Sequence, residues 1–309
     1  MISIFHSTAR AGKLVQLDNF RKGSWIQVID PSSDEIDSLV KEYGLDADLI
    51  NDALDLYEAP RIEIDDDKVY AYTRYYHVDN EVINATEPIL FIYHPDCLIT
   101  VLRIDSGILQ RHVTGVGDIV TTQKTKLLLQ FLTAVNDSYQ KYLNKTTRQV
   151  LKVRSQLKTT DIKSEVLLGL VEVSDDLNEV LSALQSHSTL LRNLLAGRHI
   201  KMFEEDRDLI EDLSLGTGEL IQLVQSRLKS IVNIRQTYDA LATAELNRTF
   251  KRLTSISIFL MVPTIFVGLY GMNVLLPLQN YEYGFWIIVA TIVIVTTGTI
   301  MYFNKKHWY

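Results

Sequence analysis

Residues 253–273 read LTSISIFLMVPTIFVGLYGMN and carry no charged side chain. An α-helix rises about 1.5 Å per residue, so about 20 such residues cross a hydrocarbon layer of ~30 Å. A second uncharged run, residues 285–303, follows the loop 274–284. The sequence therefore predicts a transmembrane hairpin of two helices near its C-terminal end, followed by a basic tail at 304–309.

The charges that flank the two spans predict their orientation. Three basic residues precede the first span and three follow the second: Arg248, Lys251, Arg252, Lys305, Lys306 and His307. The loop between the spans carries a single charged residue, Glu282. Because Lys and Arg favour the cytoplasmic side of a cell membrane, we expect both termini in the cytoplasm and the loop outside. Aromatic residues near the span ends are typical of membrane interfaces: Tyr281, Tyr283, Trp286, Tyr302 and Trp308.

The charge of the whole chain argues against a nucleic-acid partner. The 309 residues include 31 Lys or Arg and 38 Asp or Glu, which gives a formal net charge of −7, whereas nucleic-acid binders usually have a basic face. The one cysteine, Cys97, excludes an intramolecular disulfide and is typical of a reducing compartment; we expect it in a buried strand. The first residues, MISIFHSTARAGK, lack the features of a signal peptide, so the soluble part is expected to stay where it is made.

Residues 1–120 are predicted to form a cytoplasmic α/β lobe. Segments rich in Val, Ile, Tyr and Phe and bounded by turn residues indicate five strands: 2–6, 25–29, 69–77, 89–93 and 97–102. One helix is expected around residues 33–40, and a second over 46–56, ended by Pro60. The acidic run 65–67 has two interpretations, a hairpin turn between strands at 61–64 and 69–76 or a cation site.

Residues 121–252 are predicted to form long helices. Apolar residues recur at three- and four-residue steps over 122–158 and again over 162–198. This period predicts an antiparallel helix pair, and we interpret its apolar stripes as core rather than as binding surface.

A third long helix is expected to begin between residues 202 and 218 and to continue without proline to Val262. Gly216 and Gly218 are expected to bend or break its start. About 50 helical residues would measure ~75 Å, so this helix is predicted to be a stalk that continues into the first membrane span.

The end of the first span carries a distinctive motif. Tyr270 is followed by Gly271, Met272 and Asn273, at the outer end of the first of the two spans. In this position the tripeptide resembles the Gly-Met-Asn signature of the CorA family of magnesium channels. The N-terminal lobe resembles the same family in its order of segments: a strand with Trp25, a helix, and then residues 44–63, GLDADLINDALDLYEAPRIE.

The resemblance implies an architecture. CorA proteins are homopentameric funnels with an α+β cytoplasmic lobe followed by long antiparallel helices, a continuous stalk and pore helix, and a two-helix transmembrane hairpin. The expected partners are other copies of the chain, the lipid bilayer and divalent cations, without nucleic acid, and the expected location is the cell membrane. The physics agrees, because two helices cannot enclose an aqueous path and several copies around an axis can.

One face of the first span is suited to line such a path. It carries small, hydroxylated and apolar residues and no carboxylate: Leu253, Ser257, Leu260 or Met261, Thr264, Gly268 and Gly271. The second span, rich in Ile, Val and Thr, is expected to face lipid. The resemblance adds Asn247 and places Leu253, Met261 and Thr264 at pore-lining positions. An apolar constriction at Met261 and Leu253 is expected to gate by dewetting.

The mouth residues Gly271, Met272 and Asn273 are predicted to set ion selectivity. Mg²⁺ releases its inner waters reluctantly and prefers oxygen ligands. A ring of Asn273 amide oxygens accepts hydrogen bonds from the waters of a hydrated ion without removing them, and Gly271 leaves space below the ring. The resemblance makes Asn273 the first ion site.

Three of these residues also have simpler interpretations. Asn273 is suited to cap the C-terminus of the helix, as Asn often does. Thr264 is suited to donate to a backbone carbonyl near Pro263, which membrane helices tolerate. Met261 is equally suited to ordinary packing.

The resemblance also implies a regulatory Mg²⁺ site, made by acidic residues at subunit boundaries. By local pattern these residues are Asp52, on the second helix of the lobe, and Asp212, on the stalk. A bound cation would cancel the repulsion between carboxylates and favour the closed state. The chain departs from the family pattern at Asn51 and Gln236, which replace acidic residues, and its outer loop NVLLPLQNYEYG lacks the common Met-Pro-Glu-Leu. Asp52 and Asp212 are therefore also open to interpretation as solvated helix acids.

The sequence as a whole predicts a divalent-cation channel. The expected function is potential-driven influx of Mg²⁺, and of Co²⁺ or Ni²⁺, gated by intracellular Mg²⁺. One alternative is a zinc or other divalent transporter of the same fold, proton-coupled or not, against which Met272 and the lack of a His or Cys cluster argue. Another is a scaffold without conduction, against which the polar face argues. The sequence contains no P-loop, nucleophile elbow or paired metal-ligand motif, so we expect no enzyme.

Overall fold

The computed structural model describes residues 1–9, 13–77, 85–109, 113–114, 119–156, 164–196, 200–278 and 280–306. By its internal contacts the chain forms two compact units, Met1–Asn233 and Ile234–Tyr309. One helix, α6 (Glu204–Tyr270), contributes residues to both units.

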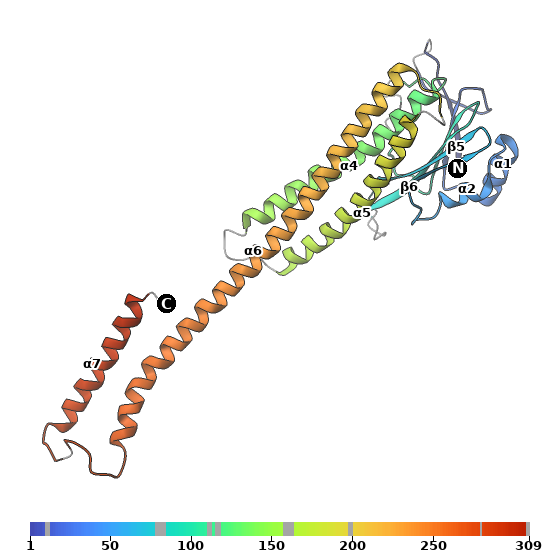
Figure 1. Ribbon diagram of the computed structural model, residues 1–309. Helices are drawn as coiled ribbons and strands as arrows, with labels where there is room; N and C mark the ends of the chain where they lie inside the picture. Colours follow the sequence, from blue (N-terminus) through green and yellow to red (C-terminus); the bar gives the residue numbers. More distant parts are fainter. Residues whose placement is uncertain are drawn as a thin grey trace. The chain divides into compact units, whose positions relative to one another are not determined.

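The first unit is built on a mixed seven-stranded sheet (Figure 1). Its strands are β1 (Ile2–His6), β2 (Val15–Leu17), β3 (Trp25–Ile29), β4 (Arg61–Asp65), β5 (Lys68–Tyr76), β6 (Thr86–Tyr93) and β7 (Leu98–Leu102). Their order across the sheet is β2-β1-β3-β7-β6-β5-β4. Neighbours are antiparallel except β3 and β7, which run parallel. All five predicted strands are present, while β2, which is short and mostly exposed, had no clear sequence signal.

One detail of the sheet differs from its prediction, and another decides between two interpretations. β6 begins three residues earlier than predicted, because the N–H groups of Ala85 and Thr86 are bonded by the Glu179 carboxylate of a distant helix. The acidic run 65–67 forms the turn of the β4–β5 hairpin, in which Asp66 has a φ of 53° and Lys68 Nζ lies 3.2 Å from Asp65 Oδ2. This confirms the hairpin interpretation of that run.

Helices cover both faces of the sheet (Figure 1). On one face, α1 (Ser33–Tyr43) and α2 (Ala47–Asp52) share a buried cluster with the strands that includes Ile26, Val28, Ile36, Leu39, Ile50, Tyr70, Tyr72, Leu90, Ile92 and Ile99. On the other face lie α4 (Lys124–Gln156) and α5 (Ser164–Leu195), where the rings of Phe131 and Trp25 are 4.8 Å apart. Because both faces are covered, β5 and β7 are buried along nearly their whole length.

The helix α2 is shorter than predicted. Asp46 caps its start by accepting from the N–H of Asp48 at 2.8 Å. It ends at Asp52, and the N–H of Asp55 then bonds to the Asp52 carbonyl at 3.1 Å in a tight turn. The predicted end at Leu56 was wrong, because this turn stops the helix well before Pro60.

The long helices agree with the predicted period but differ at their ends. α4 and α5 are the expected antiparallel pair; the predicted ends at Lys158, Ile162 and Arg198 lie outside the described residues. α6 begins at Glu204 and passes through Gly216 and Gly218 without interruption, so of the predicted bend or break, the break was wrong.

A buried contact explains why α6 continues through its two glycines. Thr217, which lies between them, is fully buried, and its Oγ1 accepts from Asn136 Nδ2 of α4 at 2.8 Å. The same Asn136 nitrogen donates to the Leu213 carbonyl at 3.3 Å. This packing outweighs the roughly 1 kcal/mol by which each glycine disfavours a helix.

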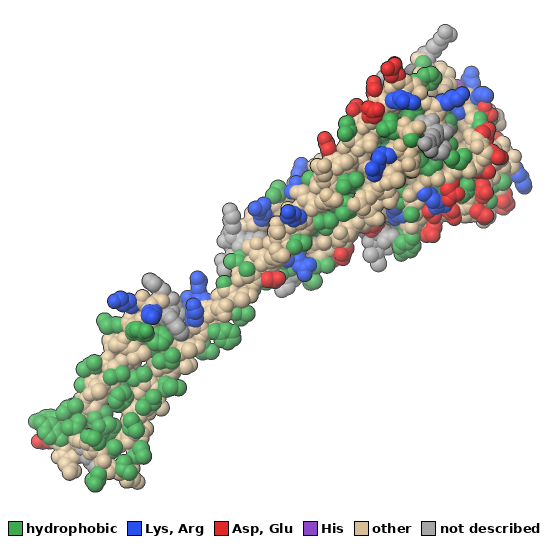
Figure 2. Space-filling view, in the orientation of Figure 1, with side chains coloured by type: hydrophobic (Ala, Val, Ile, Leu, Met, Phe, Trp, Pro, Cys, Tyr) green, Lys and Arg blue, Asp and Glu red, His purple; other side chains and the backbone are tan. Residues whose placement is uncertain are grey.

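The second unit contains the end of α6 and the helix α7 (Gly284–Lys305). Both helices are long and apolar enough to cross a membrane. Figure 2 shows hydrophobic side chains over this hairpin, with Lys and Arg at one end. Phe259 and Phe303 pack with their ring centroids 5.6 Å apart. As the sequence interpretation allowed, α6 contains Pro263; it ends at Tyr270, so the last three residues of the predicted span lie beyond the helix.

Candidate ion pathway and regulatory residues

The side chains predicted to line a path are spaced along α6. Thr264 is 11 positions after Leu253, about three turns, and Gly268 is about one turn further. All three positions are exposed on the single chain. They therefore share one open face of the helix.

The other two predicted pore residues lie at one edge of this face and beyond it. Met261 is three positions before Thr264 and seven before Gly268, which corresponds to about 60° and about 20° round a regular helix. Asn247 is 17 positions before Thr264, about 100° round the helix. Both are exposed. The geometry thus groups Leu253, Thr264 and Gly268 with Met261 at one edge, and leaves Asn247 outside the group.

The hydroxyl groups on this face are oriented by the helix itself. Thr264 Oγ1 donates to the Leu260 carbonyl at 2.7 Å, and Ser257 Oγ donates to the Leu253 carbonyl at 3.0 Å. The back-bonding interpretation of Thr264 is therefore correct. It does not remove the residue from ion chemistry: because the hydrogen points to the backbone, the oxygen lone pairs are directed outward as acceptors.

The signature tripeptide forms the turn after α6. The Gly271 N–H bonds to the Val267 carbonyl at 2.9 Å and the Met272 N–H to the Leu269 carbonyl at 3.4 Å. These backbone groups cap the helix, and the exposed Asn273 side chain makes no hydrogen bond to any described residue. The capping interpretation of Asn273 is therefore wrong in this chain, and its amide remains available to a ligand.

The loop after the tripeptide is held by hydrogen bonds of its own. Tyr270 Oη donates to the Pro277 carbonyl at 3.4 Å. The Tyr281 N–H bonds to the Leu278 carbonyl at 3.1 Å, and the Gly284 N–H to the Tyr281 carbonyl at 2.8 Å. The loop thus returns the chain to the start of α7.

Asp52 is already paired with a cation of the chain itself. Arg61 Nη2 lies 2.7 Å from Asp52 Oδ2. The same guanidinium contacts Glu58 and lies 2.5 Å from Glu63 Oε1. Its Cζ is 4.2 Å from the centre of the Tyr72 ring. Arg61 was not singled out from the sequence, because its partners are gathered by the turn after α2 and by β4.

Asp212 is exposed on α6 and makes no ion pair with a described residue. Among the described residues no hydrogen bond or ion pair joins it to Asp52, whose ion pair is with Arg61. Within the described ranges, no group of three or more His, Cys, Asp and Glu side chains is arranged to hold a metal ion. Asn51 and Gln236, where the family pattern is acidic, are both exposed.

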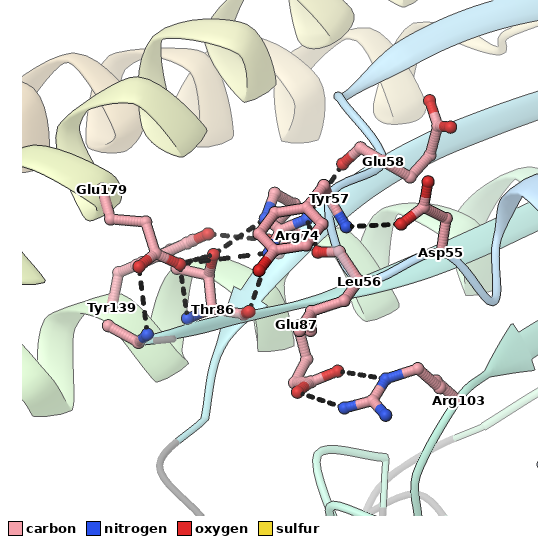
Figure 3. Close-up of polar contacts among 11 residues, drawn as sticks. Asp55, Leu56, Tyr57, Glu58, Arg74, Thr86, Glu87, Arg103, Tyr139 and Glu179 are labelled. Atoms are coloured by element: carbon pink, nitrogen blue, oxygen red, sulfur yellow. Dashed lines mark hydrogen bonds and ion pairs between the residues drawn. The ribbon is translucent and has the colours of Figure 1, made fainter. Parts of the chain in front are cut away.

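A buried polar network, missed from the sequence, fixes the segment that follows α2 (Figure 3). Arg74 of β5 donates through Nη1 to the carbonyls of Leu56 and Glu58, at 2.7 and 2.9 Å. It also donates to Thr86, at 2.8 Å from both Nε and Nη2. Thr86 in turn donates to Glu179 of α5 through its N–H at 2.9 Å and its hydroxyl at 2.6 Å. One arginine therefore links the Asp52–Arg61 segment to the sheet and to α5.

Comparison with known proteins identifies the family. The family described as CorA-like Mg²⁺ transporter protein matches residues 21–306. A curated relative, the "Cobalt/magnesium transport protein CorA" of Methanocaldococcus jannaschii, is 25% identical over 295 residues, covering 92% of this chain and 90% of its own length. The "Magnesium transport protein CorA" of Haemophilus ducreyi is 23% identical over 306 residues, covering 94% and 93%.

The fold agrees with this assignment. The complete structure of the CorA magnesium transporter from Methanocaldococcus jannaschii matches with a TM-score of 0.87 at 21% identity, covering 100% of this chain and 99% of that chain. At 21% identity the similarity shows the fold alone. It includes the lobe, the long helices and the two apolar helices. Because the family match spans most of the sequence, the chain belongs to the CorA-like Mg²⁺ transporter protein family.

Proposed function

We propose that the protein is a homopentameric channel through which Mg²⁺, and also Co²⁺ or Ni²⁺, enter the cell down the membrane potential. Membership of a transporter family, together with the two apolar helices, makes the chain a membrane protein rather than an enzyme. The relatives whose names include magnesium and cobalt support these ions as cargo.

The observation that carries the proposal is the exposed face of α6 with Asn273 beyond its end. The face offers neutral oxygen acceptors: the Asn273 amide, and Thr264 and Ser257 with their hydrogens bonded to the backbone. Such acceptors hold the waters of a hydrated divalent ion without the strong attraction of a carboxylate, so the ion also leaves. Gly271, Met272 and Asn273 would then select the ion at the mouth.

Several copies must surround the path, because a hairpin of two helices cannot enclose water. We take the axis to run along α6, with Leu253, Met261, Thr264 and Gly268 toward it and Asn247 beside them. The positive flanks support a cytoplasmic location of both termini and an external loop with Asn273. A divalent ion then gains about 4.6 kcal/mol on entry across 100 mV, twice the value for a unit charge.

Intracellular Mg²⁺ would close the channel by binding between copies at Asp52 and Asp212. The ion pair of Asp52 with Arg61 supports a site of low affinity, because the cation must displace a guanidinium that is 2.7 Å away. Asn51 and Gln236, which stand where the family pattern has acidic residues, also lower the expected affinity of this site. Mg²⁺ is in this view both the cargo and the regulator.

The test is Mg²⁺ uptake into liposomes that contain the purified protein, with an imposed membrane potential. We expect wild-type flux that follows the potential and a large loss of flux in Asn273→Ala. Asn304→Ala, which changes an exposed amide at the other end of α7, is the matched control and is expected to keep its flux.

Three results would contradict the proposal. Equal flux in Asn273→Ala and Asn304→Ala would remove Asn273 from the selectivity site. Flux that requires a proton gradient, or that prefers Zn²⁺, would favour the alternative transporter of the same fold. The absence of flux for any divalent ion at low internal Mg²⁺ would leave a membrane scaffold.

A further inference from the structure

We propose that neighbouring copies of the chain meet through two charged stripes, a basic stripe on α4 of one copy and an acidic stripe on α5 of the next. This inference rests on the proposed assembly of several copies around an axis. It adds which surfaces of the first unit face each other.

The basic stripe consists of Lys141, Lys145, Arg148 and Lys152. Their spacings of four, three and four positions place them within about 60° on one side of α4. All four are exposed, while the opposite side of the helix is buried through Tyr139, Tyr142, Leu143, Thr146 and Val150. No ion pair joins them to a described residue. Like charges at these spacings repel, so the stripe weakens an isolated helix and requires another explanation.

The acidic stripe lies on α5. Glu172, Asp175 and Asp176 occur within two turns of Glu179, and the first two are exposed. Burial raises the pKa of the Asp176 carboxyl, and the neighbouring charges of Glu179, Asp175 and Glu172 raise it further. Glu179 is engaged with Ala85 and Thr86, but the other three have no ion pair with a described residue. This stripe therefore carries negative charge that the described part of its own chain does not neutralise.

The two stripes are equally far, in sequence positions, from the connection between their helices. α4 ends at Gln156 and α5 begins at Ser164, so position 160 is midway between them. Lys145 and Asp175 are each 15 positions from this midpoint, and Arg148 and Glu172 are each 12 positions from it. In an antiparallel pair, residues equally far from the connection lie at the same level. Opposite charges on α4 and α5 would therefore face each other when two copies place these two helices side by side.

Membrane topology selects this kind of contact. Every copy must cross the bilayer in the same direction, so the symmetry axis is parallel to the membrane normal. Contacts around such an axis join two different surfaces of the chain and close into a ring. A repeated contact of this kind requires one basic and one acidic stripe on each chain. A soluble anion bound to α4 would leave the acidic stripe on α5 without a partner.

The test uses two differently tagged chains produced together, one with Lys145→Cys and the other with Asp175→Cys. We expect a bifunctional thiol reagent with a span of about 10 Å to link the two chains into a heterodimer in membranes, because the Cα atoms of a Lys–Asp pair are farther apart than the roughly 7 Å that a disulfide bridges. Arg154→Cys in place of Lys145→Cys is the matched control, because Arg154 is an exposed basic residue on another side of α4. The natural Cys97 is buried, and each variant alone controls for its reaction.

Charge reversal gives a second readout that a merely local effect would not produce. The double variant Lys145→Glu/Arg148→Glu is expected to lower the crosslinked or assembled fraction about fivefold or more at low salt. This corresponds to the free energy contributed by one to two exposed ion pairs. Glu172→Lys with Asp175→Lys is expected to do the same, and the two reversals combined in one chain to restore assembly. Arg154→Glu is expected to have no such effect.

The outcomes separate this inference from the proposed function. If the wild-type chain assembles and conducts Mg²⁺ but gives no heterodimer, or if the combined reversals restore nothing, the stripe contact is wrong and the channel stands. A chain that is monomeric in membranes would overturn the channel proposal itself. A heterodimer that forms equally well with Arg154→Cys in place of Lys145→Cys would also overturn the contact between the two stripes.

Discussion

The Arg61 guanidinium lies 2.7 Å from the Asp52 carboxylate, so the residue predicted to bind a regulatory cation is already neutralised within its own chain. Arg61 also contacts Glu58 and Glu63 and covers the ring of Tyr72. A divalent ion at Asp52 must therefore compete with a fixed positive charge. The affinity of the regulatory site is then set by an arginine as much as by the acids.

The first prediction concerns this competition. Arg61→Gln removes the positive charge and keeps a polar side chain, so the Mg²⁺ concentration that half-closes the channel is expected to fall about two- to fivefold, the worth of one partly exposed ion pair. The measurement is Mg²⁺ uptake into liposomes at a series of internal Mg²⁺ concentrations. Arg192→Gln, at an exposed arginine of α5, is the control. An unchanged midpoint in Arg61→Gln would show that Asp52 takes no part in closure.

The second prediction concerns the hydroxyl of Thr264. Thr264→Val keeps the shape and loses the acceptor, and we expect flux to fall about five- to tenfold, the effect of one hydrogen bond to a hydrated ion. Thr264→Ser keeps the oxygen and its bond to the Leu260 carbonyl, so flux is expected to stay near that of the wild type. Uptake under an imposed potential measures both. Equal flux in the two variants would mean that Thr264 does not contact the ion path.

Features that depend on chain periodicity were predictable from the sequence. The apolar runs 253–273 and 285–303 gave the two membrane helices, and the three- and four-residue steps gave α4 and α5. The β-rich segments of the lobe gave the central strands of the sheet. In each case the signal is carried by residues close together in the chain, so no knowledge of tertiary contacts was required.

Features that depend on distant contacts were not predictable. The break expected at Gly216 and Gly218 is absent because Asn136, from another helix, holds Thr217. The early start of β6 depends on Glu179, about 90 positions away in the sequence. The pairing of Asp52 with Arg61 required the turn that ends α2 before Pro60. Periodicity and capping rules contain no information on such partners.

The third prediction concerns pH and the buried His187. Its Nδ1 lies 2.7 Å from Thr73 Oγ1, its Nε2 has no hydrogen-bond partner among the described residues, and burial lowers its pKa from 6.5 to about 4. Between these two values the unfolded chain binds a proton that the folded chain does not. Stability is therefore expected to fall as the pH is lowered from 6.5 toward 4, by about 2 kcal/mol at pH 5 from this group.

The measurement is the melting temperature of the detergent-solubilised protein at pH 7 and at pH 5. His187→Gln keeps a polar group for Thr73 but does not titrate, so the drop in melting temperature between the two pH values should be smaller in this variant. Other titrating groups contribute equally to both proteins and cancel in the difference. The same drop in wild type and variant would exclude His187 as the cause.

The fourth prediction concerns Glu179, which bonds the start of β6 to α5. Its carboxylate accepts from the Ala85 N–H at 3.1 Å and from the N–H and hydroxyl of Thr86 at 2.9 and 2.6 Å. Glu179→Ala leaves these donors without a partner at a site where Thr86 is fully buried, which costs about 2–3 kcal/mol. Since Arg74 binds Thr86 and also the carbonyls of Leu56 and Glu58, the loosening is expected to reach the segment after α2.

Two measurements check this prediction. The melting temperature in detergent should fall by roughly 4–10 °C in Glu179→Ala and by less in Glu179→Gln, which keeps one acceptor oxygen. Hydrogen exchange should become faster at Ala85 and Thr86, and next in residues 54–58. Asn178→Ala, at the exposed neighbouring position of α5, should change neither quantity. If exchange rises at the start of β6 but stays unchanged in residues 54–58, then Arg74 holds that segment without help from α5, and the helix and the Asp52 region are mechanically independent.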